Sequence, residues 1–294
     1  MNECEKPFTC DFCRDIETCR RPEKGQNHND WALSNRMSKI KKKIMVMSNK
    51  GGVGKSTVTA NLGVALAEMG HKVGIADVDI HGPNIPKMLG VEGGQMKEDK
   101  EKQNGIEPLS INDNLKVVSI AFMLPNPDQP IAWRDAAKQP FLCDLVRIFN
   151  WGELDFLLAD LPPGTGNEQI TMIEEIGKAG KVDGAIIVTT PQDVALMDAQ
   201  KAILFAKDYD VPVIGIVENM SVLTCPHCDK EIDVFKSGGG EKIAEKMKVP
   251  FLGRIPLDPA ITSSCDDGKA FASGGDESKN SAAFVDIAKK IAAF

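Results

Sequence analysis

The sequence has no excess of positive charge, no long apolar run and no apolar segment near its start. Its 42 Asp and Glu residues outnumber its 35 Lys and Arg residues, for a formal net charge of -7, which argues against nucleic acid or an anionic membrane as the main partner. No stretch approaches the roughly 18 apolar residues of a membrane-spanning helix. The chain opens with Asn2, Glu3 and Cys4, where a signal peptide requires an apolar core. We therefore expect a cytoplasmic protein that binds neither nucleic acid nor a membrane.

Apolar residues are scarce in one part of the chain, residues 1–38. That segment shows no sustained period, so it cannot form a core of its own. The whole chain, with 294 residues of which 42% are hydrophobic, can bury the core of one large α/β domain or two small ones. We expect a Cys-rich N-terminal segment over residues 1–38 and a folded domain over residues 39–294.

Cysteines are frequent, and their placement favours metal binding. Thiols and metal ligands are commoner than disulfides in the cytoplasm, and six of the eight cysteines fall into two tight sets. The first set, with the spacing C-x5-C-x2-C-x5-C, is Cys4, Cys10, Cys13 and Cys19. Four thiolates at this spacing can bind zinc or an iron–sulfur cluster, which would stabilise a segment without a core. The alternative is four unligated thiols on a disordered tail.

The second set is the pair Cys225 and Cys228, in the sequence Cys-Pro-His-Cys. A C-x-x-C pair can be half of a tetrahedral metal site, a redox dithiol or a turn. One copy cannot fill four coordination positions, whereas two chains can. The remaining cysteines, Cys143 and Cys265, are expected to be core fillers or surface thiols.

A glycine-rich loop follows the apolar residues 44–47, which are typical of a buried parallel strand. Its glycines let backbone N–H groups turn toward an anion, Lys55 can supply a positive charge to the outer phosphates, and Ser56 can offer a hydroxyl to Mg²⁺. A predicted helix then points the positive end of its dipole at the same place. The predicted phosphate-binding residues are Gly51, Gly52, Val53, Gly54, Lys55, Ser56 and Thr57.

Two residues distinguish this loop from the strict pattern G-x-x-x-x-G-K-[ST]. Asn49 stands where the pattern has glycine, and asparagine is the non-glycine residue that best tolerates left-handed backbone. Lys50 adds a second cation, which an ordinary nucleotide site does not need.

Acidic residues follow two further predicted strands. Residues 72–76 lead into Asp77 and Asp79, and residues 156–159 lead into Asp160. In α/β sheets the carboxyl ends of strands carry the ligand site. Asp160 is placed to hold Mg²⁺ through water, as a Walker B acid does, while one of the other two can serve the magnesium shell and the other can orient water. Turn formation or helix capping is the structural alternative for Asp77 and Asp79.

The rest of the chain continues to alternate strands and helices. Strands are predicted near residues 116–120, 185–189 and 213–217, and helices near residues 134–150, 194–207 and 281–293. This alternation predicts a mostly parallel, doubly wound α/β sheet of the P-loop kind. Asn219 follows one of these strands, and its amide can read a base edge.

Five motifs in order resemble one family. They are Ser48-Asn49-Lys50-Gly51-Gly52-Val53-Gly54-Lys55-Ser56-Thr57, Asp77-Val78-Asp79-Ile80-His81-Gly82-Pro83, Asp160-Leu161-Pro162-Pro163-Gly164-Thr165-Gly166, Glu218-Asn219-Met220 and Cys225-Pro226-His227-Cys228. Over residues 39–294 the chain resembles the Mrp/ApbC iron–sulfur cluster carrier ATPases, which are MinD-like P-loop proteins. Its four N-terminal cysteines resemble those of the branch that includes the cytosolic iron–sulfur assembly scaffolds.

The resemblance implies an ATPase that acts as a homodimer, with slow hydrolysis. Residues 51–57 would bind the phosphates of ATP, and Lys50 would reach across the dimer interface to the partner's nucleotide. Ser56 and Asp160 would serve Mg²⁺, Asp79 would position the attacking water, and Asn219 would contact adenine.

The resemblance also implies that the protein assembles a [4Fe-4S] cluster and transfers it to apo-proteins. Cys225 and Cys228 from each of two subunits would ligate one bridging cluster, and the N-terminal cysteines could hold a second [4Fe-4S] cluster. Two other classes share the glycine-rich loop. One is a MinD/ParA-like positioning ATPase with a structural zinc site. The other is an ATP-driven electron donor like the nitrogenase iron protein, whose cluster cysteines would lie far apart in sequence.

Overall fold

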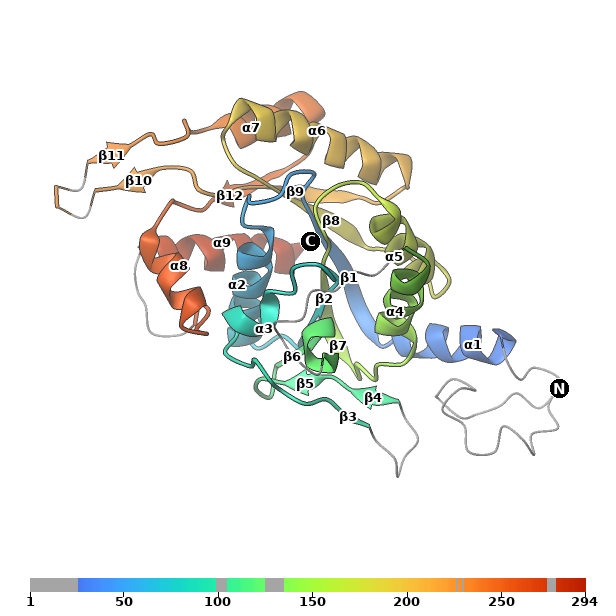
Figure 1. Cartoon of the computed structure of the whole chain (residues 1–294). Coiled ribbons are helices and arrows are strands. Elements are labelled where there is room, and N and C mark those ends of the chain that lie inside the picture. The colour runs from blue at the N-terminus through green and yellow to red at the C-terminus, as the bar shows by residue number, and fades with distance from the viewer. Residues whose placement is uncertain (1–25, 99–104, 125–134, 226, 229, 274–278) are drawn as a thin grey trace, which may run out of the picture.

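A computed structural model describes residues 26–98, 105–124, 135–225, 227–228, 230–273 and 279–294. Its centre is an eight-stranded sheet in the order β12-β9-β8-β1-β7-β2-β6-β5 (Figure 1). Neighbouring strands run parallel except at the edge, where β5 pairs antiparallel with β6. The strands are β1 (Ile40–Met47), β2 (Val73–Asp77), β5 (Leu109–Ser110), β6 (Leu115–Ser119), β7 (Leu154–Asp160), β8 (Gly184–Thr189), β9 (Val213–Glu218) and β12 (Phe251–Arg254). The predicted α/β class is confirmed.

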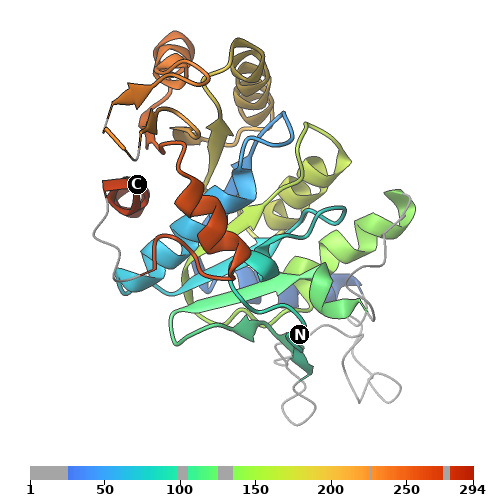
Figure 2. The same ribbon diagram turned by 60° about the vertical axis from the view of Figure 1, so that its left-hand side comes forward.

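Helices cover both faces of the sheet, as Figures 1 and 2 show. One face is covered by α1 (Gln26–Met37), α4 (Asp135–Arg147), α5 (Asn167–Gly177), α6 (Asp193–Asp208) and α7 (Gly239–Met247). The other is covered by α2 (Lys55–Glu68), α3 (Ile85–Met88), α8 (Pro259–Asp266) and α9 (Lys279–Ala293). Each face has its own hydrophobic cluster, so the central strands are buried on both sides. This explains why β2 and β8 read as continuous apolar runs.

Helix α1 was not expected, because the sequence shows no sustained period before residue 39. Leu33 and Met37 are fully buried and belong to the same hydrophobic cluster as Leu145 of α4. Two apolar residues one turn apart are enough to pack a helix against a formed core. They are too few to give a helical period that could be detected in the sequence. The packed domain therefore begins before residue 39. Cys4, Cys10, Cys13 and Cys19 lie outside the described residues.

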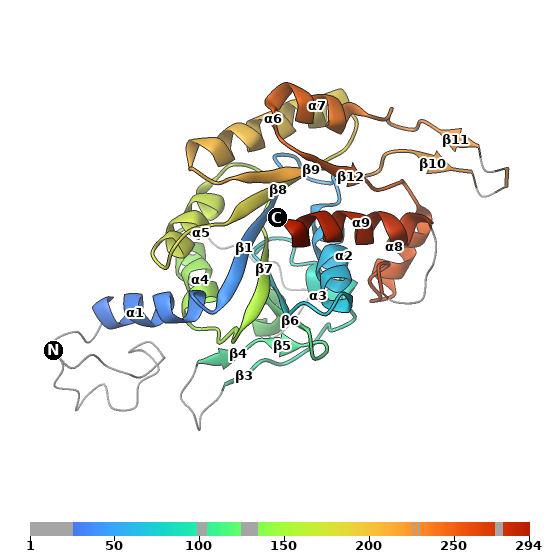
Figure 3. The ribbon, with the colours of Figure 1, turned by 180° about the vertical axis from the view of Figure 1, so that it is seen from behind.

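Shorter elements complete the chain. The 3₁₀ helix η2 (Ile120–Met123) follows β6, and β3 (Lys97–Glu98) pairs antiparallel with β4 (Ile106–Glu107). Strands β10 (Leu223–Thr224) and β11 (Glu231–Ile232) form an antiparallel hairpin. This hairpin projects from the body of the molecule, as the front and back views show (Figures 1 and 3).

Candidate nucleotide site and cysteine hairpin

The glycine-rich loop connects β1, near the middle of the sheet, to α2. Gly52 and Gly54 have φ of 77° and 79°, a left-handed conformation that favours glycine. The loop borders a cavity of about 230 Å³. The lining residues come from four segments and are Ser48, Lys50, Gly51, Gly52, Val53, Gly54, Lys55, Ser56, Thr57, Asp79, Asn84, Met88 and Pro163. The predicted phosphate loop and Asp79 therefore face one space.

Asp160 lies at the end of β7 and is fully buried. Its Oδ2 accepts hydrogen bonds from Lys55 Nζ at 2.7 Å and Ser56 Oγ at 2.6 Å. Its Oδ1 accepts one from Thr59 Oγ1 at 2.6 Å. The strand thus brings the predicted Walker B acid onto the predicted lysine and serine. Thr59 was missed by the sequence analysis, although its place one helical turn after Lys55 puts it on the same face of α2.

The two acids that follow β2 differ in environment. Asp77 is paired in register with Asp160 of β7, is fully buried, and accepts a hydrogen bond from Ser119 Oγ at 2.9 Å. Burial, and then the Asp160 carboxylate, raise the pKa of Asp77 well above its usual value. Asp79 lines the cavity, and burial raises its pKa against the opposing effect of Lys55. Asp79 is therefore the acid placed to meet a ligand.

The residues that distinguish the loop contact the α6 side of the site. Lys50 Nζ donates to Gln192 Oε1 at 3.2 Å, and Asn49 Nδ2 donates to Asp198 Oδ1 at 3.4 Å. These contacts lie within the chain, so the role of Lys50 toward a partner subunit stays a prediction.

Asn219 follows β9 and packs behind the loop. Its Nδ2 donates to the Val53 carbonyl at 2.9 Å, and a Cβ on Gly54 would lie 2.2 Å from that nitrogen. Asn219 also lines a second cavity of about 130 Å³, which shares Thr57 and Met88 with the first. The wall of the second cavity includes Met220, Pro256, Leu257 and Asp258. The predicted base-contacting residue therefore borders a space next to the phosphate loop.

The pair Cys225 and Cys228 lies in the turn of the projecting hairpin, where Cys225 N donates to the Lys230 carbonyl at 2.9 Å. Hydrogen bonds from the His227 backbone N–H, the Cys228 thiol and the Cys228 backbone N–H lower the pKa of Cys225. Cys228 is exposed. Within the described residues, no three His, Cys, Asp or Glu side chains gather where they could hold a metal ion. One copy of the hairpin offers two thiols.

Residues 39–292 match the family model described as ParA: NUBPL iron-transfer P-loop NTPase. The chain belongs to this family. An iron-sulfur cluster carrier protein of Methanocaldococcus jannaschii is 49% identical over 272 residues, which are 91% of this chain and 90% of that protein. A protein with the same description from Methanococcus maripaludis is 47% identical, over 89% of this chain and 92% of the relative. The predicted family, and with it the function class of iron–sulfur cluster carrier NTPases, is confirmed.

Solved structures of a nucleotide-binding protein and of MinD share the fold. The nucleotide-binding protein from Archaeoglobus fulgidus in complex with ADP has a TM-score of 0.71 and 38% identity, over 82% of this chain and 92% of that one. The cell division ATPase MinD of Pyrococcus furiosus has a TM-score of 0.60 and 27% identity, over 85% and 98%. The MinD-like fold of this iron-transfer NTPase is therefore confirmed. Among the described residues, no helix is both long and apolar enough to cross a membrane.

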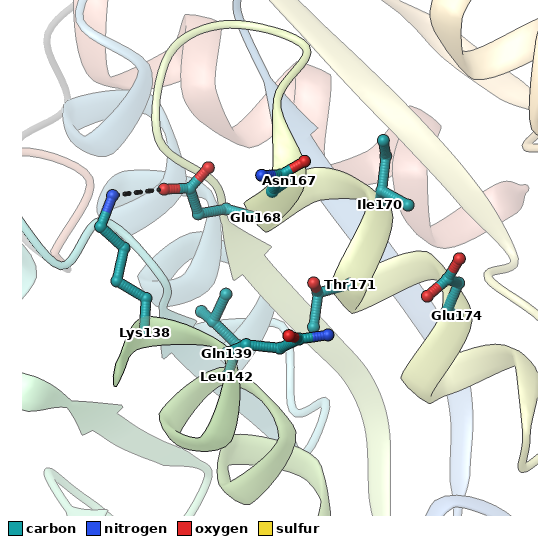
Figure 4. A pocket seen from close by; sticks show the side chains of 8 residues that line it. All are labelled: Lys138, Gln139, Leu142, Asn167, Glu168, Ile170, Thr171 and Glu174. Atoms are coloured by element: carbon teal, nitrogen blue, oxygen red, sulfur yellow. Dashed lines mark hydrogen bonds and ion pairs between the residues drawn. The ribbon is translucent and has the colours of Figure 1, made fainter. Parts of the chain in front are cut away.

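A further cavity of the NTPase lies between α4 and α5 (Figure 4). Lys138 Nζ and Glu168 Oε1 approach to 3.0 Å beside it. The start of α5 also contacts residues 162–166, which connect β7 to α5. Gln169 Nε2 donates to the Pro162 carbonyl at 2.7 Å, and its Oε1 accepts from Gly166 N at 2.9 Å. Two hydrogen bonds of Gln169 therefore join the start of helix α5 to the loop that follows Asp160.

Proposed function

We propose that this protein is an ATPase that carries a [4Fe-4S] cluster between two copies of the chain and delivers it to apo-proteins. The cysteine hairpin carries the proposal. The hairpin projects from the body of the molecule (Figures 1 and 3), and the lowered pKa of Cys225 favours the thiolate that ligates a metal. A [4Fe-4S] cluster takes four thiolates. Two chains supply that number at one site.

ATP occupies the two neighbouring cavities, which share Thr57 and Met88 in their walls. The backbone N–H groups of residues 51–57 hold the phosphates, and Asn219 contacts the adenine in the second cavity. The site fits Mg²⁺, because the Ser56 hydroxyl and the Asp160 carboxylate are oxygen donors 2.6 Å apart. When bound, Mg²⁺ neutralises charge that develops on the phosphates. Lys55 gives up part of its contact with Asp160 to reach the outer phosphates.

Hydrolysis needs a positioned water and a further cation. Asp79 lines the cavity opposite the phosphate loop and orients the water toward the terminal phosphate. Lys50 leaves Gln192 and contacts the nucleotide of the partner subunit. The ATP site and the cluster site then both depend on the dimer. Slow hydrolysis changes the dimer geometry, and this releases the cluster to the apo-protein.

The N-terminal segment adds a second metal site. Cys4, Cys10, Cys13 and Cys19 hold a [4Fe-4S] cluster within one chain, since their spacing supplies four thiolates without a partner. The described helix α1 connects this segment to the NTPase domain.

The test is iron and acid-labile sulfide per chain after anaerobic reconstitution. A bridging cluster contributes about two iron atoms per chain and an N-terminal cluster about four. The double substitution Cys225→Ser/Cys228→Ser should remove about two iron atoms per chain and the cluster-dependent dimer, whereas Cys13→Ser should remove about four. The matched control is Cys143→Ser, which removes a half-buried lone cysteine. Full iron content and an intact dimer in the double variant would disprove the bridging site.

Reconstitution with zinc alone separates the carrier from a positioning ATPase with a structural zinc site. If the protein is a carrier, the zinc-loaded form should fail to activate an apo iron–sulfur enzyme, whereas the form loaded with iron and sulfide should activate it. When zinc, iron and sulfide are offered together, the hairpin should bind iron and sulfide. Stable zinc at the hairpin, together with no cluster transfer after loading with iron and sulfide, would favour the positioning ATPase.

A further inference from the structure

The residues just before and just after the cysteine hairpin both hydrogen-bond to one buried side chain, that of Glu218. Glu218, the last residue of β9, is fully buried. Its Oε1 accepts a hydrogen bond from Ser221 Oγ at 2.7 Å, just before the hairpin, and another from Gly238 N at 3.0 Å, just after it. Its Oε2 accepts one from Gly240 N at 2.6 Å. One side chain therefore fixes both ends of the segment that carries the two thiols.

The contact with the second end is close. A Cβ on Gly240 would lie 3.0 Å from Glu218 Cβ and 3.2 Å from its Oε2, so any larger residue would push the Glu218 side chain away by a few tenths of an ångström. Arg254 Nε lies 3.4 Å from Oε1. The Glu218 side chain thus links the two ends of the hairpin segment through several hydrogen bonds at its base.

The same stretch of chain touches the nucleotide site. Asn219, next to Glu218, donates to the Val53 carbonyl of the phosphate loop. The residues around it pair with the segment after β12, in which Leu257 lines the second cavity. Ile255 N donates to the Glu218 carbonyl at 2.8 Å, Ser221 N to the Ile255 carbonyl at 3.0 Å, and Leu257 N to the Val222 carbonyl at 3.1 Å. One hydrogen-bonded ribbon therefore runs from the nucleotide site to the start of the hairpin.

We propose that Glu218 is a positioning residue that couples the nucleotide site to the cysteine hairpin, through Asn219 on one side and through Ser221, Gly238 and Gly240 on the other. A shift of the phosphate loop moves Asn219, and the adjacent carboxylate carries that shift to both ends of the hairpin. The coupling deepens the proposed carrier function and rests on it for its biological use. The mechanical link itself needs no cluster.

Hydrogen exchange of residues 223–232 in the full-length, cluster-free protein tests this link, with and without Mg²⁺ and a non-hydrolysable ATP analogue. In the wild type the analogue should change exchange in the hairpin by about fivefold or more, the lower end of typical coupling between sites. Ser221→Ala removes one hydrogen bond to the carboxylate, and Glu218→Gln replaces the acceptor that faces Gly240 N with an amide donor. Both should reduce the response to less than about twofold while analogue affinity changes by about twofold at most.

The matched control is Asp193→Ala. Asp193 pairs with Lys236 at 2.7 Å, so it contacts the same segment after the hairpin from the surface, without touching Glu218. This variant should keep the wild-type response. The coupling is disproved if the wild-type hairpin does not respond to the analogue, or if Ser221→Ala responds fully. Should the iron measurements exclude a bridging cluster while the hairpin still responds through Glu218, the carrier function fails and the coupling stands.

Discussion

The ammonium of Lys55 lies 2.7 Å from Oδ2 of Asp160, and both side chains are buried. Lys55 comes from the first turn of α2 and Asp160 from the end of β7, 105 residues later in the chain. The pair joins the phosphate loop to the acid that we propose serves magnesium. It also leaves each charge dependent on the other, because neither is solvated.

Replacing Lys55 should therefore cost both stability and nucleotide binding. In Lys55→Met the Asp160 carboxylate keeps its bonds from Ser56 and Thr59 but loses its buried cation, and we expect a loss of about 3 kcal/mol in the free energy of unfolding. Urea denaturation measures this loss. The control is Lys41→Met, which breaks the surface pair with Asp155 and should cost much less, because exposed ion pairs contribute little to stability. Equal losses in the two variants would contradict the structural role of the buried pair.

Substituting Lys50 should separate hydrolysis from binding. Lys50→Ala removes the cation that we assign to the partner's nucleotide, so ATP turnover should fall by about 100-fold, as when one charge-stabilising donor is removed from an active site. Nucleotide affinity of the monomer should stay close to that of the wild type. The comparison variant is Lys201→Ala, a surface lysine of α6 paired with Asp198. If Lys50→Ala hydrolyses ATP at the wild-type rate, the loop is an ordinary phosphate-binding loop and Lys50 has no role toward the partner's nucleotide.

Gly54→Ala should disable the loop for a steric reason. The left-handed backbone costs alanine about 1–2 kcal/mol, and the new Cβ would lie 2.2 Å from Asn219 Nδ2. We expect loss of nucleotide binding in calorimetry. Gly52→Ala carries similar backbone strain but has no atom within 4 Å of its Cβ, so it isolates the clash. If Gly52→Ala binds nucleotide as poorly as Gly54→Ala, backbone strain alone explains the loss of binding and the clash with Asn219 does not. Adding Asn219→Ala to Gly54→Ala removes the atom that clashes with the new Cβ, so it should restore part of the free energy of unfolding that Gly54→Ala loses.

Asp77 should make the protein less stable as pH rises. Its pKa is raised in the folded state by burial and by Asp160, with Lys55 opposing and Asp79 adding to the shift. Above the ordinary Asp pKa of about 4 the unfolded chain releases this proton while the folded chain keeps it, so folding weakens until the raised pKa is reached. Asp77→Asn cannot ionise, and its amide can still bond to Ser119.

The two proteins should therefore be equally stable near pH 4, and Asp77→Asn should be more stable by about 1–3 kcal/mol at neutral pH. Urea denaturation of magnesium-free protein across this range measures the difference. Asp155→Asn is a control of opposite sign, because the hydrogen bond from Lys41 lowers the pKa of Asp155. At neutral pH that variant should be slightly less stable than the wild type. The difference should vanish as pH falls through the lowered pKa, because the wild type then loses the stabilisation from its ionised Asp155. Parallel curves for wild type and Asp77→Asn would refute the raised pKa.

The local motifs were readable because each depends on neighbours in sequence. Glycines at left-handed positions, an apolar strand and a helix dipole determine the phosphate loop within residues 44–57. An apolar strand that ends in an acid is weak evidence by itself, and it predicts Asp160 only together with the phosphate loop. Helix α1 could not be predicted, since Leu33 and Met37 acquire their role only when a core is there to receive them.

The sequence by itself determined the family, the α/β class, the phosphate loop and the two thiols at Cys225 and Cys228, because these follow from residue type and short-range spacing. Only the tertiary structure decided which distant groups meet. It pairs Lys55 with Asp160, places Asp77 in the core and Asp79 at the cavity, and returns both ends of the hairpin to Glu218. These contacts depend on strand order and on the close approach of Gly240 to Glu218, and neither can be read from spacing along the chain.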